Sequence, residues 1–188
     1  LPIDLNNDGT TDFTVFALDT TIVEQGQNIP AVGCGLDLHG SNEIDASSQT
    51  VATGNIMAVT AYTNGQAINS SGAFMNGSSG GFLFPGGVLG MSATIPFVGQ
   101  TNGGNFINTT DQYIAVKFNI GVSMPTTHYG WIRVDVADNA ANIIVKDFAY
   151  ETAASTAINA GDTGGGVSIN ENELANADVF YGNSELNI

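Results

Sequence analysis

The sequence predicts an all-β protein: an antiparallel β-sandwich with an N-terminal calcium loop and a short C-terminal β tail. Helical periodicity is almost absent, and short alternating or apolar runs recur between turn residues instead. Glycine accounts for 24 of the 188 residues, and 43% of the residues are hydrophobic while only 11% are charged. Many short strands separated by closely spaced turns favour two packed antiparallel sheets.

The first dozen residues have the pattern of a loop folded around a calcium ion. Calcium takes about six to eight oxygen ligands, and alternate side chains of a tight loop can converge on one point. Gly9 allows the sharp turn that such a loop needs after its third ligand. The alternative is an ordinary polar turn without an ion. The predicted ligands are Asp4, Asn6, Asp8, the backbone carbonyl of Thr10, and Asp12.

Period-two patterns and turn residues define the remaining strands. Residues 69–90 are low in complexity, and we expect long loops there around one short aromatic strand. In the strand over residues 113–120, Ile114, Val116 and Phe118 share the face that should be buried. The predicted strands cover residues 12–18, 20–23, 32–38, 50–53, 55–62, 113–120, 128–136 and 143–150, the last two joined by a turn at residues 138–142.

The strand over residues 128–136 has two distinct faces. Ile132, Val134 and Val136 should be buried, and the opposite face carries an aromatic row that could stack sugar rings. We favour the other interpretation, in which this face packs beneath a neighbouring loop or the tail and its arginine pairs with a carboxylate. The opposite face comprises Tyr129, Trp131, Arg133 and Asp135.

A glycine-rich stretch near the C-terminus predicts a domain boundary. The sandwich would occupy residues 1–160, the linker residues 161–166, and the tail residues 167–188. An apolar tail behind such a linker can add a strand to an open sheet edge, in its own subunit or in the next. A head-to-tail contact that does not close would make a filament.

The charge balance excludes several partners. A formal net charge of −15 arises from 18 acidic residues against Lys117, Arg133 and Lys146, so we expect no nucleic-acid binding. No apolar run is long enough to span a membrane, and we expect no insertion. Cys34 is the single cysteine and should be a small buried residue. Because the chain starts at Leu1 without methionine, a signal peptide is expected to have been removed.

Signatures of catalysis are scarce, and we predict no enzymatic activity. Residues 77–81 match the spacing of a nucleophile elbow, but a glycine- and serine-rich loop without a following helix satisfies that spacing by chance. The two histidines, His39 and His128, belong to no zinc-type spacing. One acidic stretch leaves open a second cation or acid-base site, with a solvated loop as the alternative. It contains Asp37, His39, Glu43 and Asp45.

Several stretches resemble a family of secreted bacterial β proteins that pair an N-terminal calcium loop with a C-terminal hairpin of the type Tyr-Gly-Trp-x-Arg. They are DLNNDGTTDF at residues 4–13, YGWIRVDV at 129–136 with IVKDFAYE at 144–151, and AINAG at 157–161. Residues 167–175 and 185–188 resemble the opening of the C-terminal sorting domain of type IX secretion cargo from Bacteroidota. The resemblance implies export to the cell surface or medium and implies no catalytic activity.

We therefore expect a secreted, non-enzymatic surface protein with a structural or adhesive role, stabilised by Ca²⁺. Its expected partner is a further copy of itself, joined through the C-terminal strand into a filament. The alternative is a carbohydrate-binding module or glycan hydrolase that holds a surface glycan on Tyr129, Trp131 and Arg133.

Overall fold

The computed structural model describes residues 1–24, 26–52, 54–77, 86–95 and 99–163. The tail predicted over residues 167–188, and the linker from residue 164 onward, lie outside the described residues. Within the described part the fold is all β, as predicted, and its one helical element is a single 3-10 turn, η1 (Asp138–Ala140). This turn lies where the sequence predicts a turn between two hairpin strands.

Fourteen strands make up the described fold, and nine of them form one continuous path. The strands are β1 (Pro2–Ile3), β2 (Phe13–Glu24), β3 (Gln27–Leu38), β4 (Glu43–Val51), β5 (Gly54–Val59), β6 (Ala61–Tyr62), β7 (Ala67–Ile68), β8 (Phe74–Met75), β9 (Gly87–Ile95), β10 (Gly99–Gly103), β11 (Thr109–Ile120), β12 (Thr126–Ala137), β13 (Asn142–Tyr150) and β14 (Ile158–Asn159).

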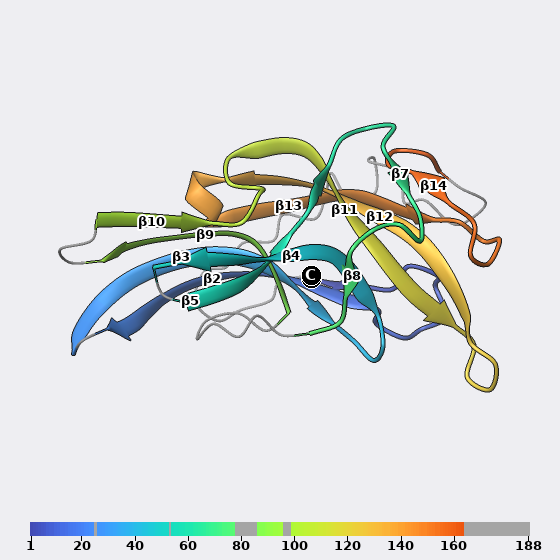
Figure 1. Ribbon diagram of the computed structural model, residues 1–188, viewed down its shortest axis with the longest axis horizontal. Coiled ribbons are helices and arrows are strands. Elements are labelled where there is room, and N and C mark those ends of the chain that lie inside the picture. Colours follow the sequence, from blue (N-terminus) through green and yellow to red (C-terminus); the bar gives the residue numbers. More distant parts are fainter. Residues whose placement is uncertain (25, 53, 78–85, 96–98, 164–188) are drawn as a thin grey trace, which may run out of the picture.

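The main sheet curls until its two halves face each other. Its strand order is β1-β2-β3-β9-β5-β4-β11-β12-β13, and the pairs are antiparallel except β5 with β9. Strand β4 forms the corner, because residues 46–51 pair with β5 while Glu43 and Ile44 pair with β11. Strands β11, β12 and β13 therefore lie over β2, β3 and β5, as two layers of a sandwich-like fold (Figure 1).

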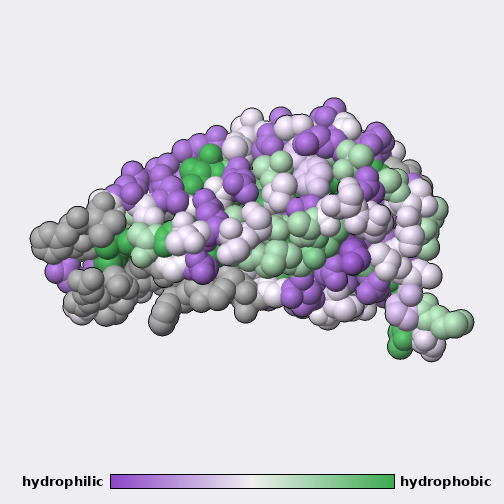
Figure 2. All heavy atoms as spheres, in the orientation of Figure 1, coloured by the Kyte–Doolittle hydropathy of each residue, from purple (hydrophilic) through white to green (hydrophobic). Residues whose placement is uncertain are grey.

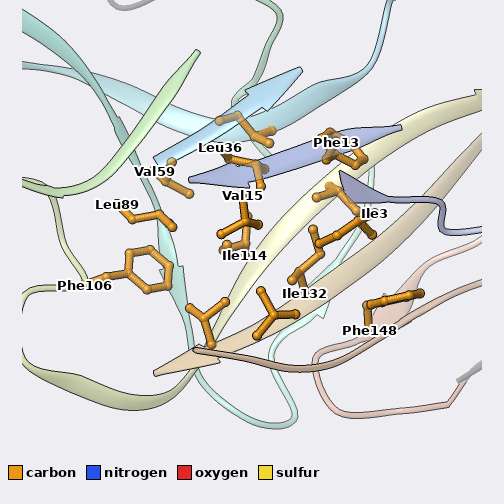
Figure 3. Packing of buried hydrophobic residues seen from close by; sticks show 14 of the residues in the cluster. Ile3, Phe13, Val15, Leu36, Val59, Leu89, Phe106, Ile114, Ile132 and Phe148 are labelled. Carbon is orange, nitrogen blue, oxygen red and sulfur yellow. The ribbon is translucent and has the colours of Figure 1, made fainter. Parts of the chain in front are cut away.

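The main core fills the space between the two halves. Phe13 and Leu36 enter it from β2 and β3, and Ile114 and Ile132 enter it from β11 and β12 (Figure 3). The buried faces predicted for β11 and β12 are confirmed, because these alternate apolar side chains all belong to this cluster. Cys34 is buried, as predicted, and burial raises the pKa of its thiol to about 12, so the reactive thiolate is suppressed.

Two differences from the predicted strands have physical causes. The runs predicted at residues 12–18 and 20–23 are one strand, β2, because its ladder with β3 continues through the exposed Asp19 without a break. Strand β9 begins within the stretch 69–90, where the sequence suggests low complexity and loops, and continues to Ile95, where no strand was predicted. Its glycines fit there because the backbone is crowded: a Cβ at Gly87 would collide with Ile44 and Val59.

Candidate calcium loop and outer sheet face

The predicted calcium loop connects β1 to β2 and is clamped at its base. The Asp12 amide donates to the Ile3 carbonyl at 2.8 Å, which closes the loop like a hairpin. Apolar side chains on both sides of the loop, Ile3, Leu5 and Phe13, are at most 2% exposed. The loop is therefore held by the core, and any change in its conformation acts directly on the first strands.

Three of the predicted ligands turn their side-chain oxygens toward the same stretch of loop backbone. The Asp8 amide lies 3.2 Å from an oxygen of both Asp4 and Asn6, and the Gly9 amide donates to the other Asp4 oxygen at 2.7 Å. The Thr10 amide donates to Asp8 at 2.8 Å. Asn7 and Gly9 have φ angles of 56° and 87°, which let the chain wrap around these oxygens.

Asp12 lies apart from these three side chains, at the buried base of the loop. Its Oδ2 accepts the Leu5 amide at 2.8 Å, and its Oδ1 lies 3.3 Å from the Asn42 side-chain amide. Burial raises the pKa of the Asp12 carboxyl, and the nearby Asp4 and Asp8 charges raise it further. Asp12 thus ties the loop to the β3–β4 connection, and a second lone pair on Oδ1 leaves room for an ion beside the Asn42 contact.

The chemistry of the loop fits a hard cation. Its donors are carboxylate, amide and carbonyl oxygens, without nitrogen or sulfur ligands, as calcium prefers. The pKa of the exposed Asp8 carboxyl is lowered by the hydrogen bonds from the Asn6 side chain and the Thr10 amide. Within the described residues no three His, Cys, Asp or Glu side chains are already gathered around one point. The calcium set therefore stays a prediction.

The acidic residues at the end of β3 and the start of β4 are not gathered into a second site in this structure. Asp45 accepts hydrogen bonds from Thr60 and Tyr62 at 2.7 and 2.8 Å. Glu43 forms an ion pair with Lys117 at 2.6 Å. In His39, Nε2 lies 2.9 Å from the Thr14 hydroxyl oxygen, which belongs to β2. The side chains proposed for this site thus have separate structural partners, and Asp37 contacts the amide of its neighbour Leu38.

The aromatic row on β12 is buried, as the favoured interpretation predicts. Tyr129 and Trp131 are 5% and 3% exposed, beneath the small sheet formed by β7 and β14. The indole N–H of Trp131 donates to the Asp162 carbonyl at 2.8 Å, and the ring packs edge-on against Tyr113. Because these rings are covered, they cannot stack on a sugar in this conformation. The glycan-binding alternative was based on this exposed face, so the burial argues against it.

A cover over Trp131 was predicted, but not the segment that supplies it, since residues 151–163 have neither a strand pattern nor an apolar run. Asp162, which the sequence assigns to the linker, is docked on the domain. The Asp162 backbone N–H donates to the Asn159 backbone carbonyl at 3.0 Å. The Asn159 side-chain amide donates to the Asp162 carboxylate at 2.9 Å. The folded unit therefore extends at least to Asp162. The Asn-x-x-Asp spacing, typical of a polar turn, was the available signal.

All three basic side chains of the chain are ion-paired. Arg133 pairs with Asp147 through two bonds of 2.8 and 2.6 Å, which confirms the predicted carboxylate partner. Lys146 lies 2.8 Å from Asp111 and 3.0 Å from Asp135, and Lys117 pairs with a glutamate as described above. No cationic side chain is left over to attract a phosphate or an anionic lipid surface.

The loop between β11 and β12 exposes the most accessible large apolar side chains of the described residues. Val122 and Met124 are 101% and 87% exposed. The loop projects from the body of the molecule (Figure 1), and hydrophobic atoms gather on this projection (Figure 2). Nothing in the sequence distinguishes this tip, because two isolated apolar residues in a turn are a weak signal.

No helix among the described residues has the length and apolar character needed to cross a bilayer.

The resemblance to secreted bacterial β proteins and to type IX cargo is an expectation from sequence motifs alone. Comparisons with protein-family models, with curated proteins and with solved structures found no match to this chain.

Proposed function

We propose that this chain is a non-enzymatic, extracellular structural or adhesive protein, exported to the cell surface or medium and stabilised by Ca²⁺. The supporting observation is that reactive side chains of the described part serve structural contacts. His128 is buried, with Nδ1 2.8 Å from the Glu151 carbonyl oxygen and Nε2 2.9 Å from the Thr126 hydroxyl oxygen. Cys34 is buried, and His39 joins a loop to β2. These contacts favour a scaffold role over acid-base or nucleophilic catalysis.

Calcium would act on stability through the N-terminal loop. The ion would be held by Asp4, Asn6, Asp8, the Thr10 carbonyl and Asp12, whose Oδ1 also contacts the Asn42 side-chain amide. It would neutralise the carboxylates of this loop, whose mutual repulsion helps to raise the Asp12 pKa. Since Leu5 and Phe13 anchor the loop in the core, the binding energy would appear as stability of β1 and β2.

Chelation of calcium is expected to lower the melting temperature. At a free calcium concentration about ten times the dissociation constant, binding contributes about 1.4 kcal/mol. For a chain of this length this corresponds to roughly 3 to 6 °C. The measurement is a thermal unfolding curve of the full chain with excess calcium and with excess chelator, followed by circular dichroism.

Matched variants separate a bound ion from a general charge effect. Asp4→Asn and Asp8→Asn each keep one of the two oxygens that accept loop hydrogen bonds and remove the ligand charge, so they should abolish the response to chelator. Asp19→Asn makes the same charge change on β2, outside the loop, and this variant should still melt at a lower temperature in chelator. A melting curve that chelator leaves unchanged in the unsubstituted chain would remove calcium from the proposal.

Self-association through the tail is the second part of the proposal. Within the described residues, every buried side-chain nitrogen and oxygen has a hydrogen-bond partner. The tail itself has apolar positions and four of the 18 acidic residues, with none of the three basic ones. Like charges therefore oppose association, and we expect salt to strengthen it by screening.

Removal of the tail is expected to abolish self-association. The shortened chain should end at Thr163, because the Asp162 carbonyl holds the Trp131 indole. Size-exclusion chromatography with light scattering at about 0.15 and 0.5 M NaCl should show concentration-dependent oligomers only for the full chain. Oligomers that persist in the shortened chain would place the contact elsewhere on the domain.

A further inference from the structure

We propose that Asn69, in the turn between β7 and β8, is the acceptor of an N-linked glycan. The proposal rests on the export proposed above and adds a covalently attached sugar chain. The sequence contains three Asn-x-Ser/Thr triplets, the acceptor motif for N-glycosylation, which begin at Asn69, Asn76 and Asn108. Such triplets also arise by chance in a chain rich in asparagine, serine and threonine. The structure distinguishes the three by what their side-chain nitrogens contact.

The chemistry of the modification requires an available side-chain nitrogen. Nδ2 of the asparagine attacks the anomeric carbon of a sugar chain that is carried on a lipid diphosphate. The bond between that carbon and the diphosphate oxygen breaks, the diphosphate leaves with the electron pair, and one Nδ2 proton passes to a base of the transferase. Because the product keeps only one N–H on Nδ2, an asparagine that uses this nitrogen in the fold is a poor acceptor.

Asn69 holds its side-chain oxygen and presents its nitrogen. Oδ1 accepts the Ser71 backbone N–H at 2.9 Å and the Ser71 hydroxyl at 2.7 Å. Since a backbone N–H can only donate, the atom that accepts it must be the oxygen, which fixes the orientation of the amide. Among the described residues no group accepts a hydrogen bond from Asn69 Nδ2, and every buried side-chain nitrogen there has a partner. Asn69 Nδ2 is therefore accessible to solvent.

The nitrogens of the other two triplets serve the fold. Asn76 Nδ2 donates to the Gly40 carbonyl at 3.2 Å and to the Asn42 carbonyl at 2.7 Å, which joins the chain after β8 to the β3–β4 connection. Asn108 Nδ2 donates to Asn139 Oδ1 at 3.0 Å, and Asn108 Oδ1 accepts the Asn139 N–H at 2.9 Å. A glycan at either position would compete with contacts that the described structure already uses.

The backbone around Asn69 is also the easiest of these segments to lift into an enzyme site. Ser70 and Ser71 are exposed, and the turn is closed by one backbone hydrogen bond, from the Gly72 N–H to the Asn69 carbonyl at 3.1 Å. This turn connects strands of only two residues each, β7 and β8. The hydroxyl residue of the Asn108 triplet instead belongs to β11, a strand of twelve residues. Opening the turn thus disturbs fewer backbone contacts.

The test is enzymatic transfer to the folded full chain, produced in a host without N-glycosylation. The chain is incubated with a purified oligosaccharyltransferase and an oligosaccharide on a lipid diphosphate, and peptide mass mapping gives the rate at each triplet. Each rate is divided by that of a short peptide with the same triplet, which removes the preference of the enzyme for the sequence itself. After this correction, Asn69 should react at least tenfold faster than Asn76 or Asn108.

Matched variants test the role of the side-chain contacts. Ser71→Ala destroys the triplet and should lower transfer to Asn69 at least tenfold, whereas Ser70→Ala keeps the triplet and should leave it within twofold. Asn139→Gly removes the acceptor of Asn108 Nδ2 and suits the φ of 56° at this position, so transfer to Asn108 should rise at least fivefold. Melting curves of each variant confirm that the chain remains folded.

The native protein supplies a second readout. Isolated from the medium or the cell surface of its source, the chain should carry a glycan at Asn69, which an amidase releases to leave an aspartate. An exported chain without this glycan, or corrected transfer rates that are equal at Asn69 and Asn108, would overturn the inference and leave the proposed function intact. A chain that remains inside the cell would refute the proposed export and the modification together.

Discussion

Replacement of Trp131 by alanine is expected to lower the free energy of unfolding by about 3 to 5 kcal/mol, the range for removal of a large buried aromatic side chain. Trp131 is 3% exposed and contacts Tyr113 edge-on at 5.2 Å between ring centroids. The variant would also leave the Asp162 carbonyl without its donor. The measurement is urea denaturation followed by far-ultraviolet circular dichroism, with and without calcium.

Trp131→Phe separates packing from the hydrogen bond. Phenylalanine keeps most of the buried ring but cannot donate to Asp162, so we expect a loss of about 1 to 2 kcal/mol. The local consequence should be faster hydrogen exchange and easier proteolysis over residues 151–163, which this bond holds down. If Trp131→Ala had the stability of the parent chain but lost binding to a glycan array, the buried packing described here would be wrong.

Features set by interactions between neighbouring residues could be predicted from the sequence, whereas features set by residues far apart in the chain could not. The faces of β11 and β12 could be predicted because alternation between buried and exposed residues is a local property of a strand. The burial of Trp131 was one of two possibilities on sequence alone. Its cover comes from β14, 27 residues further along the chain at Ile158, through a turn with no strand pattern. Such a contact becomes visible only with the tertiary fold.

The candidate calcium loop shows the same limit at shorter range. The alternate spacing of Asp4, Asn6 and Asp8 predicts that their oxygens converge on an ion, which stays a prediction; in the structure these oxygens accept backbone amides of the same loop. The different position of Asp12 could not be foreseen. It depends on Asn42, which lies 30 residues away and reaches the loop only because β3 pairs with β2. Sequence spacing thus places these side chains in one loop, while a non-local partner decides how the Asp12 carboxylate is held.

Replacement of Asp45 by alanine is expected to lower the free energy of unfolding by about 3 kcal/mol, because this carboxylate has a structural role. Its carboxylate is the common acceptor for the Thr60 hydroxyl, the Tyr62 hydroxyl and the Ala73 amide, at 2.7, 2.8 and 3.1 Å. Removal leaves three donors without a partner, each at a cost that partial access of water reduces. Burial and the adjacent carboxylate both raise the pKa of Tyr62, so the phenol remains a donor throughout the neutral range.

Two further variants make the Asp45 prediction specific. Asp45→Asn keeps one carbonyl oxygen and should lose about half as much stability, whereas Asp37→Ala, whose carboxylate contacts only the amide of its neighbour Leu38, should lose about 0.5 kcal/mol or less. Denaturation midpoints measured with calcium and with chelator discriminate the structural role from the second cation site that the sequence left open. An Asp45→Ala penalty that vanished with chelator would identify Asp45 as a cation ligand. A constant penalty follows if this carboxylate serves to join β4 to the chain segments that begin at Thr60 and end at Ala73.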